Sequence, residues 1–427
     1  MNNSTIMRSY HIFLFVSLLF SASVLYGQNT LSSSAQIDSL VLESNQELTK
    51  PVVNFYIENS GSMFGYIPSQ TKSDNDFVWA ISSLLTNLSV SGFTDINKIN
   101  KYYLNSKAFK QDDNTASFIK KVTTHNAQTF QGDLGATSMS HIFDLLVSTT
   151  GRDTISIVVS DFIISPGKGK NAENVLASEA NAITTCINDK LSQSPDFAIC
   201  AYRLTSRFKG RLYDCLDDSE YIDTVRPYYI WIMGSKQQIS RFNQIVKITK
   251  ANNTNAIINE HIFFGSKNIK SPYYRIIQKT SGQIQPVQKK GQPVNTIKKA
   301  KLQNGRFMLA IRVNLKEYSL LGGYLENVEN YVIDNDNYSI VSIKKASEDG
   351  EYDMKIETTR PLSPANINIS LKQTFPEWIK DFSVEECSQV ARNLDKTYGV
   401  LTIFNAVNKA YNYNVENIFS ITLSINK

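Results

Sequence analysis

The sequence of 427 residues is poor in the side chains on which many enzymes and metal proteins depend. It has four histidines and four cysteines, and the cysteine spacing matches no zinc signature. It contains neither G-x-x-x-x-G-K-S/T nor G-x-G-x-x-G, the loops that bind nucleotide phosphates. An excess of one charge is also missing, because 44 basic and 39 acidic side chains leave a net charge of +5. These absences argue against a zinc protein, a nucleotide enzyme and a nucleic-acid binder.

The N-terminus contains the one long apolar run of the chain. Arg8 and His11 precede the apolar residues 12–26, which end at Gly27. This run is shorter than the ~20 residues of a membrane span, so it predicts a secretory signal peptide over 1–27. Residues 28–50 are polar and rich in serine, and we expect them to form a tether. The chain is therefore expected to be exported, with no integral membrane segment after cleavage. Its composition resembles exported Gram-negative proteins, which suggests the periplasm, the outer surface or the medium.

Export permits disulfide bonds. The four cysteines are Cys186, Cys200, Cys215 and Cys387. They allow three full pairings, and the sequence does not choose among them. Buried free thiols with one bridge fit the spacing as well as a full disulfide framework does.

Residues 51–250 alternate short apolar runs with helical patterns. Strands are predicted at 52–57, 99–106, 154–161, 197–204 and 226–234, and helices at 74–88, 139–149, 172–191 and 235–248. This alternation predicts βαβ units, hence an α/β domain with a mainly parallel central sheet flanked by helices. From about 255 to 427 strand-like segments recur between turn signals, which predicts a β-rich domain, sandwich-like or barrel-like. That domain includes a late helix at 397–412.

Oxygen-bearing side chains follow two of the predicted strands. In FYIENSGSM, Glu58, Ser60 and Ser62 come directly after the first strand, and residues two apart in an extended segment point the same way. Asp161 ends a later strand, and Thr137 stands just before a helix. Ligands of α/β sheets gather at the carboxyl ends of the strands. An all-oxygen set suits a hard divalent cation, most of all Mg²⁺, with Mn²⁺ or Ca²⁺ as alternatives.

These motifs resemble the von Willebrand factor A domain and its metal-ion-dependent adhesion site. The resemblance rests on ENSGSM after a strand, G-A-T before a helix and IVVSD at a strand end, and it covers about residues 50–250. It implies a Rossmann-like fold whose metal is held by Glu58, Ser60, Ser62, Thr137 and Asp161. It also implies a non-enzymatic adhesion role, in which the metal captures an acidic residue of a partner protein.

Two residues depart from the family pattern. Glu58 stands where the family has Asp, and its longer side chain shifts the carboxylate outward by about one methylene. Phe162 follows Asp161 at a position where glycine is common in the family. The first departure makes metal binding by Glu58 an open question.

Two other functions remain open from the sequence. A cell-envelope hydrolase would use a serine or a metal-activated water, and S-x-x-K at 69–72 with S-D-N at 73–75 matches two elements of penicillin-interacting enzymes. These elements are adjacent here, whereas they lie far apart in that family, and K-T-G is approximated only by KTSG at 279–282. A metal-free scaffold would use the hydroxyls and Glu58 to join loops and cap helices.

Overall fold

The computed structural model describes residues 49–427 with short gaps. The gaps are 68–75, 124–131, 133–137, 165, 214, 216–218, 247, 251–252, 258–259, 266–270, 278–282, 288–295, 348–349, 361–363, 413–415 and 426–427. The predicted signal peptide, nearly all of the predicted tether and Thr137 lie outside the described residues. So do the three short motifs of the hydrolase hypothesis, at 69–72, 73–75 and 279–282.

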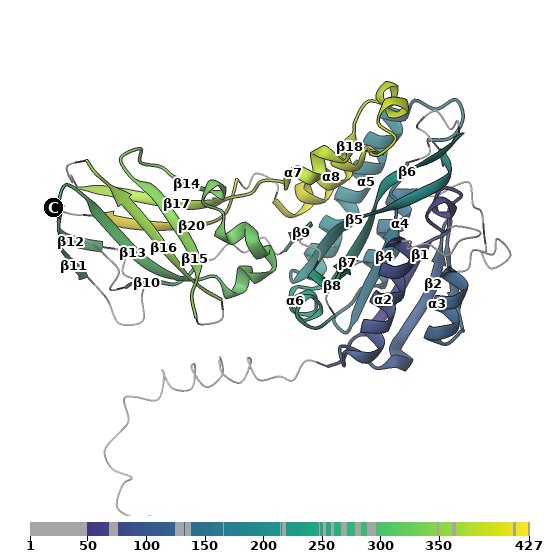
Figure 1. Cartoon of the computed structure of the whole chain (residues 1–427), viewed down its shortest axis with the longest axis horizontal. Helices are drawn as coiled ribbons and strands as arrows, with labels where there is room; N and C mark the ends of the chain where they lie inside the picture. The colour runs from purple at the N-terminus through teal and green to yellow at the C-terminus, as the bar shows by residue number, and fades with distance from the viewer. Residues whose placement is uncertain are drawn as a thin grey trace, which may run out of the picture. The chain divides into compact units, whose positions relative to one another are not determined.

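A seven-stranded sheet forms the first half of the chain (Figure 1). In spatial order its strands are β3 (Ala108–Gln111), β2 (Ile99–Leu104), β1 (Val52–Glu58), β4 (Thr154–Ser160), β6 (Ser219–Ser235), β5 (Phe197–Tyr213) and β9 (His261–Phe264). The pairs β1–β2 and β1–β4 are parallel, and the other neighbouring pairs are antiparallel. The predicted α/β class is confirmed, and the sheet is mixed with a parallel centre.

Helices cover both faces of this sheet. One face packs against α2 (Asp76–Val90), α3 (Thr115–Thr123) and α6 (Lys236–Ile245), and the other against α4 (Met139–Thr149), α5 (Ala172–Gln193) and α8 (Val400–Asn412). The central strands are buried on both faces, so β1 sends Phe55 into the first core and Tyr56 into the second. This double burial explains why β1 and β4 are almost continuously apolar in sequence.

The hairpin β5–β6 is much longer than the rest of the sheet. Its register runs from Phe197 opposite Ser235 to Tyr213 opposite Ser219. The neighbouring strand β4 pairs with β6 only from Ser156 to Ser160. The far half of the hairpin therefore extends past the carboxyl ends of β1 and β4. The sequence predicted two strands here but not this extension, in which polar and apolar residues alternate.

The C-terminal region contains two further sheets that share one hydrophobic core. The first has the order β10 (Tyr274–Ile276), β13 (Phe307–Asn314), β16 (Glu351–Thr358) and β15 (Ser339–Lys345). The second has the order β11 (Gln283–Val287), β12 (Thr296–Lys301), β20 (Asn417–Ile425), β17 (Ala365–Lys372) and β14 (Tyr331–Ile333). Most of the pairings are antiparallel, and β12–β20 is parallel. Strong β content in this region agrees with the prediction.

The shorter elements connect these layers. They are η1 (Ser62–Tyr66), η2 (Ile96–Lys98), β7 (Thr249–Lys250), β8 (Asn253–Ile257), η4 (Lys316–Glu326), η5 (Val328–Asn330), α7 (Glu377–Asp381), β18 (Ser383–Val384), η6 (Cys387–Arg392) and β19 (Thr397–Tyr398). A disulfide joins Cys215, at the turn of the β5–β6 hairpin, to Cys387 in η6. Cys186 and Cys200 are free thiols.

The predicted domain 255–427 does not coincide with the packing. Strand β9 pairs with β5 in the first sheet, and α8 buries Ile403 and Phe404 in the same core as α5. The chain thus returns to the α/β layers between β17 and β20. The cause is the wide apolar face of α8, which packs against α5 rather than against the neighbouring β sheets.

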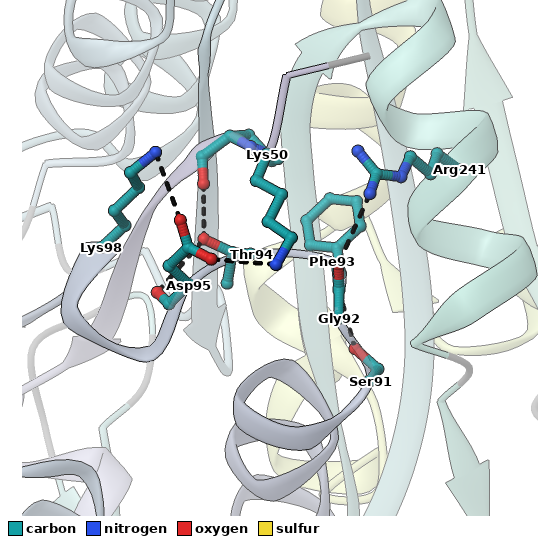
Figure 2. A network of polar contacts seen from close by, with 9 residues as sticks. Lys50, Ser91, Gly92, Phe93, Thr94, Asp95, Lys98 and Arg241 are labelled. Atoms are coloured by element: carbon teal, nitrogen blue, oxygen red, sulfur yellow. Dashed lines mark hydrogen bonds and ion pairs between the residues drawn. The ribbon is translucent and has the colours of Figure 1, made fainter. Parts of the chain in front are cut away.

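Polar contacts fix the amino end of β1, opposite to the end that carries Glu58 (Figure 2). Asp95 forms ion pairs with Lys50 (3.0 Å) and Lys98 (3.4 Å). The hydroxyl of Thr94 donates to the carbonyl of Pro51 at 2.5 Å. The start of β1 is thereby attached to the loop that leads into β2.

In the described part of the chain no helix is long and apolar enough to cross a membrane.

Candidate functional site

The parallel pairing of β1 with β4 brings the two acidic side chains of the predicted site to one sheet edge. Ile57 lies opposite Val159, so Glu58 and Ser160 end neighbouring strands and Asp161 follows directly. The Ser160 hydroxyl donates a hydrogen bond to the Glu58 carboxylate. Glu58 is 1% exposed and Asp161 is fully buried. The carboxylates that the sequence placed at this edge are therefore both there, beneath the surface.

The two serines of the S-x-S motif lie next to each other at the same edge. Their hydroxyl oxygens are 3.0 Å apart. Ser62 begins the 3-10 helix η1 and is buried, whereas Ser60 is half-buried. Ser60 thus forms the more accessible side of the site. Four of the five predicted ligands are brought together, and the fifth, Thr137, lies outside the described residues.

Asp161 has a buried oxygen without a partner. Its Oδ1 accepts a hydrogen bond from the backbone N–H of Ile163 at 3.2 Å, and Oδ2 forms none. Burial raises the pKa of the Asp161 carboxyl, and the nearby Ser62 hydroxyl and Arg226 guanidinium partly oppose that rise. An unsatisfied buried carboxylate oxygen costs free energy unless a proton or a cation reaches it. The donor set present therefore fits a hard cation, with Asp161 as its most available oxygen ligand.

Phe162, which follows Asp161, has a backbone conformation that is usual for glycine. Its φ is 55°, a left-handed conformation that bulky residues rarely adopt. Its ring is buried, stacks on Trp231 at 5.2 Å and meets Phe143 edge-on at 6.3 Å. Its N–H donates to the Ser160 hydroxyl at 2.8 Å. Packing thus holds a strained residue in place beside the candidate ligand.

The extended hairpin packs tightly on the loop of Ser60 and Ser62. A Cβ added to Gly65 would lie 2.3 Å from the Phe208 ring of β5, and one added to Gly210 would lie 2.7 Å from the Gly65 backbone. Gly210 is therefore required for the close approach of the two backbones, and Gly65 for the contact with the Phe208 ring. A Cβ on Gly61 would meet the Tyr213 ring at 3.1 Å. Gly61 and Gly65 thus allow the hairpin to pack closely against one side of the site.

Arg226 is a charged residue of this region that the sequence motifs did not indicate. It is 1% exposed, and its terminal nitrogens donate to the backbone carbonyls of Leu394 and of Lys396, the latter at 3.0 Å. Its guanidinium lies 5.7 Å from the centre of the Phe208 ring. The only sequence signal for a special role is an arginine at the start of the apolar run RPYYIWIMG.

A metal centre rich in charged ligands is not found in the described residues. No group of three or more His, Cys, Asp or Glu side chains gathers there. The candidate set differs from such a group because it combines two carboxylates with hydroxyls. Whether it binds a cation therefore depends on the two carboxylates, the hydroxyls and the charge around them.

Comparisons with protein-family models, with curated proteins and with solved structures find no match to this chain. The resemblance to the von Willebrand factor A domain accordingly rests on the residues of the motif and on their shared position at the sheet edge.

Proposed function

We propose that this chain is an exported, non-enzymatic binding protein of the von Willebrand factor A type. Its divalent cation, Mg²⁺ in the first place, is held by Glu58, Ser60, Ser62 and Asp161 with Thr137, and it captures an acidic group of a partner protein. The observation that supports this most is the buried, unpartnered Oδ2 of Asp161. It lies at the carboxyl edge of a parallel strand pair, where α/β proteins bind their ligands.

The chemistry of the donors supports a hard cation rather than a nucleophile. The hydroxyls of Ser60 and Ser62 are hydrogen-bonded to each other, and Glu58 accepts from Ser160. Carboxylate and hydroxyl oxygens are the ligands that Mg²⁺ and Ca²⁺ prefer. When bound, the cation supplies a strong attraction for a carboxylate. Ser60 is the half-buried member of the set, so we place the entry of the partner's acidic group on its side.

A metal-free scaffold is the second candidate, and burial is the observation that favours it. Glu58 and Asp161 are almost wholly inaccessible, and Ser62 is 5% exposed. In this case the polar residues would join β1, β4 and η1, and no cation would be needed. The two candidates differ in the response of the protein to cations.

The thermal midpoint separates them. The chain without residues 1–27 is heated with EDTA, Mg²⁺, Mn²⁺ or Ca²⁺, together with Asp161→Ala and with Asp223→Ala as a matched control. Asp223 is an acidic residue of the hairpin that pairs with Arg207 outside the site. A ligand that binds only the folded state raises the midpoint. The proposal predicts a rise in the wild type and the control that is lost in Asp161→Ala; no rise up to millimolar cation would support the scaffold.

A further inference from the structure

Arg226 is a buried cation without a carboxylate partner. Its two terminal nitrogens bind backbone carbonyls, its Nε has no hydrogen-bond partner, and no ion pair involves it in the part of the chain that the structure describes. An arginine remains protonated even when buried. A buried charge is costly unless an opposite charge compensates it. The residues around Arg226 must therefore contain a counter-charge that is close without being in contact.

Asp161 is that counter-charge. Ser160 of β4 lies opposite Tyr229 of β6, so Asp161 and Arg226 occur just beyond the last residues of one antiparallel pair. Tyr66 of η1 contacts β6 beside Arg226, since its hydroxyl donates to the carbonyl of Pro227 at 2.6 Å. Arg226 also lowers the pKa of both Asp161 and Tyr66, against a larger rise caused by burial. Asp161 and Arg226 thus interact while each keeps one polar atom unpartnered.

A segment from the end of the chain holds Arg226 in this position. We call residues 382–398 the strap. The disulfide between Cys215 and Cys387 ties it to the hairpin, and Phe382 packs against the Arg203 guanidinium at 3.8 Å. Its carbonyls at 394 and 396 accept the hydrogen bonds of Arg226. The strap therefore engages two of the five N–H donors of the guanidinium and fixes where the group lies.

We propose that Arg226 sets the cation affinity of the candidate site by competing with the cation for Asp161, and that the strap restrains this competition. The inference rests on the proposed function, because it concerns the same site. When the strap is in place, Arg226 leaves Oδ2 of Asp161 open. When the strap is released, the guanidinium loses its carbonyl acceptors and pairs with Asp161 instead.

The formal charges give this arrangement a consequence for the partner. Glu58 and Asp161 contribute two negative charges and Arg226 one positive charge, so a divalent cation leaves the site with an excess of one positive charge. One carboxylate of a partner neutralises that excess. Arg226 thus weakens cation binding and at the same time strengthens the attraction of the loaded site for a single acidic group.

The test measures Mn²⁺ affinity from the free-ion signal in electron paramagnetic resonance. Arg226→Gln removes the charge and keeps a hydrogen-bond donor, whereas Arg226→Lys keeps the charge. We expect Mn²⁺ to bind about tenfold more tightly to the Gln variant than to the wild type, and the Lys variant to resemble the wild type. Circular dichroism of each protein establishes that it is folded.

A second pair of variants tests the strap without touching Arg226. Removing the disulfide by Cys215→Ala with Cys387→Ala should weaken Mn²⁺ binding by about threefold or more, because Arg226 gains access to Asp161. In the Arg226→Gln background the same removal should leave the affinity unchanged. This non-additivity distinguishes competition from a general loosening of the fold, which would weaken binding in both backgrounds.

The outcomes separate the two proposals. If the wild type binds Mn²⁺ and neither Arg226→Gln nor disulfide removal changes the affinity, the role of Arg226 is overturned. The proposed function then still stands. Equal weakening by disulfide removal in both backgrounds likewise overturns the role of Arg226. No Mn²⁺ binding by any of the proteins overturns the proposed function and this inference together.

Discussion

Arginines and carboxylates form ion pairs in the β-rich C-terminal region, whereas Asp161 and Arg226 at the carboxyl edge of the first sheet do not pair with each other. On the first C-terminal sheet, Arg312 pairs with Asp353 at 2.6 Å and Arg306 pairs with Glu357 on the neighbouring strand. These side chains keep part of their surface in solvent. At the carboxyl edge, Asp161 and Arg226 are both buried, and they remain apart with an unpartnered polar atom each.

The contrast shows which of the two regions contains buried charges that lower the free energy of unfolding. Paired surface charges contribute little to the free energy of unfolding, and losing one costs little. Buried polar atoms without partners are costly, and native proteins keep them mainly where a ligand or a reaction needs them. The carboxyl edge, rather than the β sheets, is therefore where the proposed cation site is expected.

The largest effect should come from removing the buried arginine. Arg226→Ala leaves the carbonyls of Leu394 and Lys396 without donors and Asp161 without a counter-charge. We expect it to lower the free energy of unfolding by about 4 kcal/mol. The matched change Arg306→Ala removes a half-exposed arginine just before β13 and should change the free energy of unfolding far less. Urea denaturation measures both, and equal costs would remove the contrast.

Loss of the disulfide should have the next largest effect. The bond joins residues separated by 172 positions, so it restricts the unfolded chain strongly. Cys215→Ala with Cys387→Ala should lower the free energy of unfolding by about 3 kcal/mol. Cys186→Ala, which removes a free thiol, is the control and should cost about 1 kcal/mol or less. If the double variant matched the control, the strap would not depend on the disulfide.

Replacing Phe162 should show that the packing of its ring contributes more to stability than its backbone strain costs. Phe162→Gly relieves about 1 kcal/mol of backbone strain but loses a buried ring worth about 3 kcal/mol, so it should destabilise by about 2 kcal/mol. Asn304 has a similar φ of 53° in an exposed turn of the β-rich region. Asn304→Gly should change stability by about 0.5 kcal/mol or less. A stabilising Phe162→Gly would mean that the ring contributes less than its contacts suggest.

Asp161 should give the smallest effect, and one of opposite sign. Its folded-state pKa is raised above the ordinary 3.8, so the folded state binds the proton more tightly. The resulting stabilisation is full below about pH 3.8 and is lost as pH rises through the folded-state pKa. In chelator at pH 7, Asp161→Asn removes a desolvated carboxylate but also the counter-charge of Arg226. Because burial is the larger influence on the Asp161 pKa, the net change should be a small stabilisation, on the order of 1 kcal/mol or less, with loss of this pH step.

The control is the paired acid of the β sheet. Asp353→Asn removes the ion pair with Arg312 and should destabilise by about 1 kcal/mol. Urea midpoints between pH 4 and 8 compare the two variants with the wild type. A destabilising Asp161→Asn in chelator would place Asp161 among the ordinary structural carboxylates.

Much of the α/β layer could be predicted because its signals are local. The helix predicted at 139–149 has the bounds of α4, and the double burial of β1 and β4 reads directly from their apolar runs. Glu58, Ser60, Ser62 and Asp161 were predicted to meet because parallel strands end at one edge. For this, only the parallel direction of the two strands had to be known, and not their contacts.

The rest depends on contacts between distant parts of the chain. The hairpin extension alternates Phe208 with exposed Arg207 and Lys209, a pattern that is typical of any half-exposed strand. The partners of Arg226 come from a strap about 170 residues later, as does the partner of Cys215. Periodicity and spacing do not indicate such pairs, so the charge balance of the site could not be predicted from the motif.

Direct measurement of Mn²⁺ binding to the wild type decides whether Asp161 and its neighbours form a cation site. Equilibrium dialysis of the chain without residues 1–27 against Mn²⁺ measures the number of ions bound, with Asp161→Ala beside it and Asp353→Ala as a control for surface carboxylates. We expect one Mn²⁺ per chain in the wild type and the control, and none in Asp161→Ala. Equal binding by all three proteins, or none by the wild type at millimolar Mn²⁺, would contradict this expectation.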